Sequence, residues 1–219
     1  VWTLDGTDTF KELSERAEAG VDRINITSDI VVTAPVYFCG NTVLYSDDDH
    51  TLTRDPGYNG DMLVVGENAK GEGILWNGDA PKLTLGGGEG TLTVDGNKEN
   101  ITVTVEGSLL FVSESATVDL YDGIRLANNL KLGNKRAYII GDDGKPTYAT
   151  KRVGGAGVVI IDATVNMHGG IIENCEVFSA TVDEAGNPIS TVDSACGGAV
   201  YNRSSFNMYG GIIRNNLAL

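Results

Sequence analysis

The stretch at residues 197–216 reads GGAVYNRSSFNMYGGIIRNN. It holds three short apolar strands, separated by a polar turn, a Gly-Gly corner and an Asn-Asn corner. A pattern this compact is typical of one coil of a solenoid, in which each coil packs on the next. The stretch therefore predicts the fold class of the region that contains it.

The same pattern occurs earlier in the chain. Residues 166–174 read NMHGGIIEN, and residues 207–215 read NMYGGIIRN. A weaker copy relates residues 116–124, ATVDLYDGI, to residues 163–171, ATVNMHGGI. Such repeats predict coils stacked in register, so the repetition indicates architecture strongly and activity weakly.

Composition narrows the class of partner. The 219 residues carry a formal net charge of −14, 29 glycines and 41% hydrophobic side chains. Such an acidic chain argues against nucleic acid and anionic membrane surfaces, because both bind basic faces. No apolar run is long enough to cross a membrane, so we expect no membrane insertion within this segment. Since the chain begins at Val1 without Met, we expect a fragment of a longer protein whose export signal and anchor lie elsewhere.

Residues 7–19 predict one amphipathic helix. Thr7 or Asp8 can cap its start. Its apolar side chains fall on one face: Phe10, Leu13 and Ala17. Because a solenoid leaves an open apolar end, we expect this helix region (1–22) to cap the coils of a single domain (23–219).

Two longer segments interrupt the coils, near residues 130–153 and 176–196. In each, residues of strand type flank a turn with glycine and proline, so both segments predict β-hairpins that leave the same corner of successive coils. Without them a coil has about twenty residues, the size of a β-helix repeat. Stacked hairpins would form a side sheet suited to recognition, and tolerated loop insertions are the alternative.

Strand alternation assigns side chains to the two faces of each coil. The inward columns are expected to be Val118, Val165 and Phe206, and Leu120, Met167 and Met208. The outward columns are expected to be Asp119, Asn166 and Asn207, and Tyr121, His168 and Tyr209. The stacked inward columns would then form the core.

These repeats resemble the right-handed parallel β-helix repeats of bacterial cell-surface and adhesin-like proteins, in the pectate-lyase-like superfold. Coils there read roughly as Gly-Gly-x-Val-x-Asn, strand, Gly-Gly, Ile-Ile, x-Asn-Asn. The match is close over residues 155–216, looser over 60–130 and only architectural over 1–60. The resemblance implies an all-β fold: a right-handed parallel β-helix, a solenoid with three strands per coil, with the N-terminal capping helix and hairpin excursions added.

The same architecture serves polysaccharide lyases and glycoside hydrolases as well as non-catalytic adhesins. The paired-Asp, Asn-Thr-Asp and Gly-His-Gly motifs of the hydrolases do not occur as a set. For a lyase-type calcium cluster, Asp119 could join Glu114 or Asp122 beside Arg125, but later coils do not repeat these acids. We therefore predict no catalytic residue and no metal site, with calcium as the one ion left open, and keep the carbohydrate-active enzyme as an alternative.

The outward columns are the candidate ligand-binding residues. The rings of Tyr121, His168 and Tyr209 could stack on sugar rings, while Asp119, Asn166 and Asn207 could bond sugar hydroxyls; a structural ladder is the alternative. The resemblance then implies a non-catalytic, adhesin-like module of a bacterial surface or secreted protein, extracellular, that binds a polysaccharide, host glycan or host protein. A purely structural stalk is the third possibility.

Cys175 and Cys196 lie at the two ends of the second excursion. In the repeat pattern both points fall at one corner, so a disulfide that clasps the base of the hairpin is reasonable for an exported protein. Two free thiols are the alternative.

Overall fold

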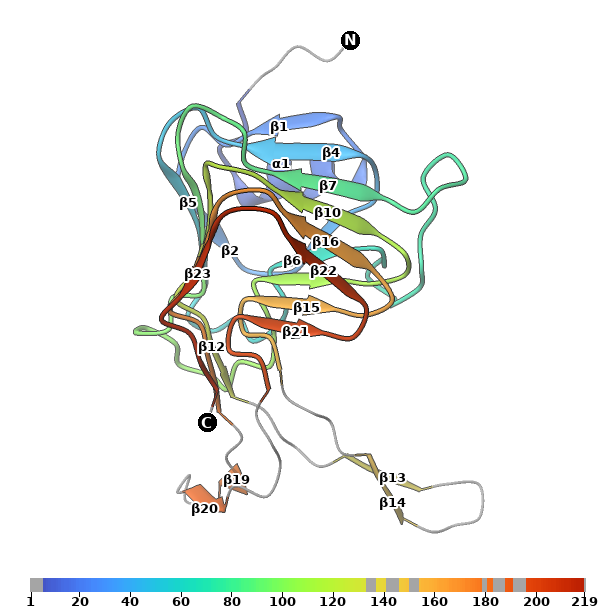
Figure 1. The fold of residues 1–219 in the computed structure, drawn as a ribbon, viewed down its shortest axis with the longest axis vertical. Coiled ribbons are helices and arrows are strands. Elements are labelled where there is room, and N and C mark those ends of the chain that lie inside the picture. The colour runs from blue at the N-terminus through green and yellow to red at the C-terminus, as the bar shows by residue number, and fades with distance from the viewer. Residues whose placement is uncertain are drawn as a thin grey trace.

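The computed structural model describes residues 6–132, 137–140, 146–149, 154–178, 181–182, 188–190 and 196–218. Among these residues the chain is mostly β, with one helix and with parallel sheets that stack strands from distant parts of the sequence. Figure 1 shows the stack, which runs from β1 near the N-terminus to β22 near the C-terminus.

Three parallel sheets hold most of the strands. Sheet 1 contains β1 (Arg23–Asn25), β4 (Thr42–Tyr45), β7 (Lys82–Leu85), β10 (Thr117–Leu120), β16 (Thr164–Met167) and β22 (Ser205–Met208). Sheet 2 contains β2 (Ile30–Val32), β5 (His50–Arg54), β8 (Leu92–Asp95), β11 (Ile124–Ala127), β17 (Ile171–Glu173) and β23 (Ile212–Arg214). Sheet 3 contains β3 (Val36–Phe38), β6 (Leu63–Val65), β9 (Leu110–Val112), β15 (Val158–Ile160) and β21 (Val200–Asn202). Because the chain visits the three sheets in turn, the arrangement is compatible with the predicted parallel β-helix.

A fourth parallel sheet was not predicted. Sheet 4 contains β12 (Leu130–Leu132), β18 (Glu176–Phe178) and β24 (Leu217–Ala218). Its first two strands lie within the segments that the sequence assigned to the excursions. The parallel stack therefore continues into the base of each excursion, and the later passes of the chain carry four strands instead of three.

The repeats stack in the register that the sequence predicted. Asp119 lies opposite Asn166, which lies opposite Asn207. In sheet 2, Ile172 pairs with Ile213 in the same way. The two sequence copies are therefore neighbours in space, one on the other.

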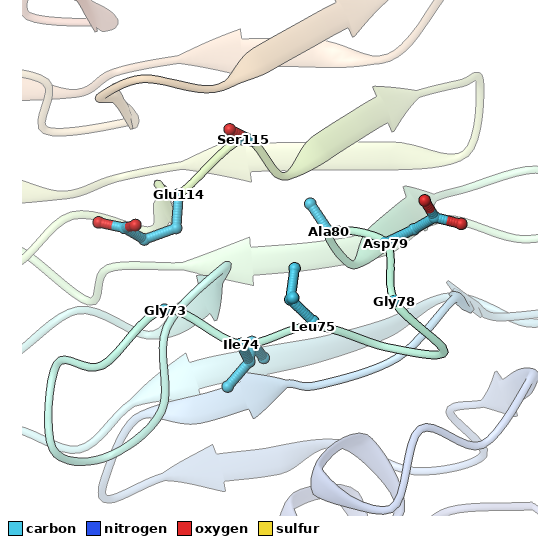
Figure 2. Close-up of a pocket in the computed structure, with 8 residues that line it drawn as sticks. All are labelled: Gly73, Ile74, Leu75, Gly78, Asp79, Ala80, Glu114 and Ser115. Carbon is cyan, nitrogen blue, oxygen red and sulfur yellow. The ribbon is translucent and has the colours of Figure 1, made fainter.

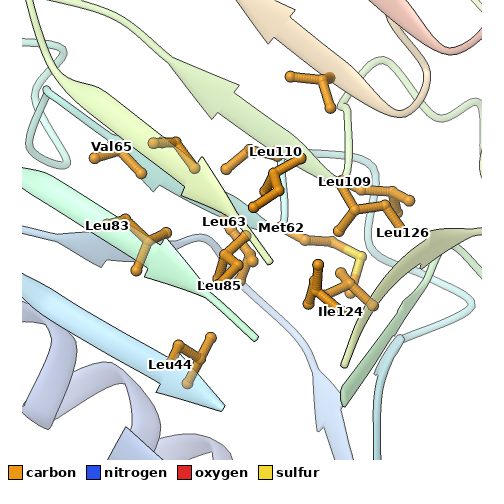
Figure 3. Packing of buried hydrophobic residues seen from close by; sticks show 14 of the residues in the cluster. Leu44, Met62, Leu63, Val65, Leu83, Leu85, Leu109, Leu110, Ile124 and Leu126 are labelled. Atoms are coloured by element: carbon orange, nitrogen blue, oxygen red, sulfur yellow. The ribbon is translucent and has the colours of Figure 1, made fainter. Parts of the chain in front are cut away.

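All three main sheets contribute side chains to one apolar core, and Figure 3 shows part of it, with Leu85 from sheet 1, Leu126 from sheet 2 and Leu63 from sheet 3. Val118, Val165 and Met167 are fully buried, as predicted. Burial of one such side chain stabilises the fold by about 1.5–3 kcal/mol. Met208 and Phe206 continue the inward columns in register with Met167 and Val165, but Met208 is 49% exposed and Phe206 is only partly buried. Both lie on β22, which pairs with β16 on one side and with no described strand on the other.

The helix α1 (Phe10–Glu18) covers the end of the stack near β1, where it contacts β1, β2 and β3. Leu13 and Ala17 are fully buried there. Its N-cap is Thr9 rather than Thr7 or Asp8, because the Thr9 hydroxyl accepts the bond from the Glu12 backbone N–H at 3.3 Å. Thr7 instead forms a parallel bridge with Ile26.

Left-handed asparagines turn the chain after the strands of sheet 2. Asn128, Asn174 and Asn215 have φ between 54° and 57°. Asparagine tolerates this region better than other side chains. The Asn174 amide donates to Asn128 Oδ1 at 3.3 Å, and the Asn128 amide donates to Asp95 Oδ2 at 2.8 Å. These bonds tie successive corners to one another.

Two antiparallel strand pairs lie where the sequence predicted hairpins. β13 (Ala137–Ile140) pairs with β14 (Pro146–Ala149), and β19 (Thr181–Val182) pairs with β20 (Pro188–Ser190). The predicted turns between them lie outside the described residues. Each pair is a separate two-stranded sheet, so the expected side sheet of stacked hairpins is not formed by these four strands (Figure 1).

Candidate functional site

The predicted aromatic residues form a stacked column. The ring centroids of Tyr121 and His168 are 4.8 Å apart with an interplanar angle of 13°, and those of His168 and Tyr209 are 5.0 Å apart at 14°. The residues directly follow β10, β16 and β22, so the parallel register sets this spacing. Both faces of the His168 ring are covered, one by Tyr121 and the other by Tyr209. The edges of the rings and the outer face of Tyr209 remain exposed to solvent.

The predicted polar residues form a directional hydrogen-bonded ladder. The Asn207 amide donates to Asn166 Oδ1 at 2.9 Å, and the Asn166 amide donates to Asp119 Oδ1 at 2.8 Å. Lys82, which the sequence did not single out, lies with its Nζ 2.7 Å from Asp119 Oδ2. The ladder therefore ends on a carboxylate that a lysine neutralises.

Asp119 is less available than predicted. Its side chain is only 8% exposed, because Lys82 and Asn166 cover it. Burial by itself would raise its pKa, but the hydrogen bonds from Lys82 and Asn166 outweigh burial and leave the pKa lowered. The same pair raises the pKa of Lys82. Asp119 thus serves to anchor the ladder, and Asn166 and Asn207 remain the residues of this column that face solvent.

Glu173 on sheet 2 carries a second charged cluster. Arg125 Nε and Arg214 Nε each lie 2.6 Å from a different oxygen of its carboxylate. The hydrogen bond from Arg214, and then that from Arg125, lower the pKa of Glu173 against the effect of burial. Sequence reasoning missed this cluster, although the aligned repeats carry Glu173 and Arg214 at one register position.

The lyase-type grouping considered from the sequence is not formed. Asp119 lies on β10 of sheet 1 and is bound to Lys82, whereas Arg125 lies on β11 of sheet 2 and is bound to Glu173. Asp122 Oδ1 accepts the Gly170 backbone N–H at 3.3 Å. Asp119 therefore pairs with a cation on sheet 1, and Arg125 pairs with an anion on sheet 2.

Within the described part of the chain, no three His, Cys, Asp or Glu side chains come together as a metal-ligand group. His168 Nε2 lies 3.9 Å from Asp119, and His50 Nδ1 lies 3.7 Å from Asp29. Each histidine thus has one carboxylate beside it. A calcium ion stays a prediction that the geometry does not test.

Arg54 is a buried cation that the sequence did not reveal. Its side chain is fully buried, and its terminal nitrogens donate to the carbonyls of Tyr58, Gly60 and Ser108. Burial lowers its pKa to about 10, so the guanidinium stays charged at neutral pH. These bonds fasten the loop after β5 to the start of β9, which is a structural role.

An open cavity of about 420 Å³ lies between the loop after β6 and the turn before β10 (Figure 2). Its lining residues are Gly73, Ile74, Leu75, Gly78, Asp79, Ala80, Glu114 and Ser115. The carboxylates of Asp79 and Glu114 stand at opposite ends, and neither points at the other. The cavity therefore offers apolar contact but no assembled acid pair.

The disulfide considered from the sequence is not formed. Cys175 is buried and Cys39 and Cys196 are partly exposed, and no disulfide joins any two of them. Cys175 points into the core, where its thiol donates to the Glu173 carbonyl at 3.4 Å and burial raises its pKa to about 12. The reason is local: the left-handed turn at Asn174 directs the next side chain inward.

None of the helices in the described part is long and apolar enough to cross a membrane. Comparison of the chain with protein-family models, with curated proteins and with solved structures found no match.

Proposed function

We propose that this chain is a non-catalytic module of right-handed parallel β-helix architecture, from a bacterial surface or secreted protein, and that it binds an extended glycan along the solvent side of sheet 1. The observation that carries the proposal is the pairing of the aromatic column with the amide ladder. Sugars present an apolar C–H face beside hydroxyl groups, and this surface offers rings beside amides.

The exposed rings of the aromatic column are the best-placed contacts. Tyr121 is 41% exposed and Tyr209 is 70% exposed. Beside Tyr209, Asn207 donates to Asn166 but accepts no hydrogen bond from any described residue at its own Oδ1. Since His168 and Asn166 already hold these side chains in place, little conformational entropy is lost when a sugar binds.

The two buried carboxylates of sheets 1 and 2 suit a non-catalytic role. Glycoside hydrolysis uses two carboxyl groups about 5–9.5 Å apart, one of them protonated near neutral pH. Asp119 and Glu173 have lowered pKa values and lie on different sheets. Each is bound to a cation, so neither suits the role of general acid.

The test is a glycan array combined with a polysaccharide-degradation screen. The wild-type chain is expected to bind a set of glycans without cleaving them, and Tyr209→Ala and Asn207→Ala are expected to abolish or weaken that binding. Val31→Ala, which trims a side chain that is 52% exposed on β2 of sheet 2, is the matched control and should bind as the wild type does. Cleavage products, or binding unchanged in both sheet 1 variants, would contradict the proposal.

A structural stalk is the second candidate, and one observation favours it. Inside the stack, the ring faces and amides satisfy one another, as in a ladder that only stiffens the sheet. A stalk would bind no glycan on the array, while His168→Ala would still lower the stability of the chain. The same array therefore separates the two functions.

A further inference from the structure

The Arg125–Glu173–Arg214 cluster on sheet 2 has donors that its own bonds do not use. Each arginine donates through Nε alone, to one oxygen of Glu173. A guanidinium has five N–H donors, so four remain on the two terminal nitrogens of each arginine. No other described residue accepts a hydrogen bond from either guanidinium.

The two guanidiniums, rather than the carboxylate, face solvent. The side chains of Arg125 and Arg214 are 36% and 52% exposed, while that of Glu173 is 4% exposed. The arginines therefore cover the glutamate. A molecule that approaches this face meets two cations with free N–H groups and a shielded anion.

Glu173 lies between the two like charges and holds both in place. Arg125 lies on β11 and Arg214 on β23, with β17 and Glu173 between them. Two arginines and one glutamate leave a local charge of one positive unit, in a chain whose formal net charge is −14. The fold has already ordered both side chains, so an anion that bridges them meets a prepared site.

An apolar surface adjoins the cluster. Arg125, Ile171 and Ile212 lie in register on neighbouring strands, and Ile212 is among the exposed large hydrophobic residues. Strand alternation places Ile212 on the same side of β23 as Arg214. The face thus combines a cationic pair with a small apolar platform.

We propose that Arg125 and Arg214 bind a single oxyanion group, the carboxylate or sulfate ester of an acidic sugar whose ring lies against Ile212. Guanidinium groups match the paired oxygens of these anions. A long polyanion is disfavoured, because the net charge of −14 on the chain repels it. The proposal concerns sheet 2 and does not rest on the function proposed for sheet 1.

The test compares glucuronate with glucose, which share a ring and differ at the carboxylate. NMR titration of the wild-type chain at low salt is expected to show saturable shifts with glucuronate and glucose 6-sulfate, and none with glucose. Sodium sulfate is the probe for the anion alone, and its binding should be weaker than that of the sugars. Equal responses to glucuronate and glucose would overturn the proposal without any variant.

Variants then locate the site. Arg125→Gln and Arg214→Gln are each expected to weaken glucuronate binding by about tenfold or more, as loss of a charge-assisted hydrogen bond does. Arg203→Gln removes the same charge from an exposed position on another part of the last pass, and it should leave the affinity unchanged. If Arg203→Gln weakens binding as much as the other two, the interaction is general charge attraction and the site is refuted. Thermal unfolding of each variant confirms that a loss of binding is not a loss of fold.

Discussion

Met167 and Met208 occupy the same register position on neighbouring strands, yet one is fully buried and the other is 49% exposed. Ile172 and Ile213 differ in the same way on sheet 2. The sequences around these residues are nearly identical. A side chain in such a repeat is therefore fully buried only when a strand is stacked on each side of its own strand.

Paired substitutions test this comparison. In each pair, one residue lies inside the stack and the other lies in the last coil, β21 to β24. Met167→Ala is expected to cost the most, about 2–5 kcal/mol of unfolding free energy, because it opens a cavity in a closed layer. Met208→Ala should cost about 1 kcal/mol or less, since half of the side chain is already in water. Urea unfolding followed by circular dichroism measures both. Equal losses would show that the last pass is packed as tightly as the others.

The charged cluster gives the next largest effect. Glu173→Gln is expected to lower stability by about 1–3 kcal/mol at neutral pH, because it removes the anion that separates two guanidiniums. Arg214→Gln, on the last pass, should cost about 1 kcal/mol or less, since the exposed arginine is well solvated.

The cost of Glu173→Gln should depend on pH in one direction. The folded pKa of Glu173 lies below the unfolded value of about 4.3, so the carboxylate stabilises the fold fully above that value. The contribution disappears as the pH falls through the folded pKa. The gap between the wild type and Glu173→Gln should therefore stay constant from neutral pH to about pH 5 and shrink in more acidic buffer. A gap that widens with acid would refute the ion-pair account.

The corner asparagines give a smaller contrast. Asn128→Ala is expected to cost about 1–2 kcal/mol, from left-handed strain and from the bonds to Asp95 and Asn174. Asn215 has the same left-handed backbone, but no described residue hydrogen-bonds its amide. Asn215→Ala should therefore cost about 1 kcal/mol, from strain alone. Differential scanning calorimetry resolves the two, and a larger loss at Asn215 would contradict this division.

The aromatic column gives the smallest effect. His168→Ala removes two stacked contacts and is expected to cost about 1–2 kcal/mol, whereas Tyr209→Ala removes one and should cost about 0.5–1 kcal/mol. Both follow from thermal unfolding at fixed pH. A Tyr209→Ala variant as unstable as His168→Ala would mean that Tyr209 has contacts beyond the ring stack.

Repetition made the register predictable. Aligning the two copies was enough to place Asn166 opposite Asn207 and the rings of His168 and Tyr209 together, because parallel stacking turns a sequence offset into a spatial neighbour. Sheet 4 was missed although part of it is repeated. Residues 128–132 read NNLKL and residues 215–219 read NNLAL, but β18 between them follows a different corner, Asn174-Cys175, and lies in a segment assigned to an excursion.

The sequence predicted which residues form the candidate site, but it did not predict their hydrogen bonds and ion pairs. The sequence gathered the aromatic and polar columns, but it could not show that Lys82 would neutralise Asp119. Lys82 lies on β7, outside the recognisable copies, and it reaches Asp119 only because two distant strands pair. The Arg125–Glu173–Arg214 cluster was hidden in the same way, since Glu173 and Arg214 share a register position with opposite charges while Arg125 is in register with Ile171.

The three-strand pattern of the repeated coils and their corners follow from residues 197–216 and their copies alone, because alternation and left-handed turns are local properties. Which outward groups remain accessible follows from the tertiary structure. Asp119 and Cys175 were candidates from the sequence and became, respectively, an anchored carboxylate and a buried thiol. A side chain is accessible to a ligand only if the side chains on the neighbouring strands do not cover or bond it. Those neighbours come from residues far apart in the chain.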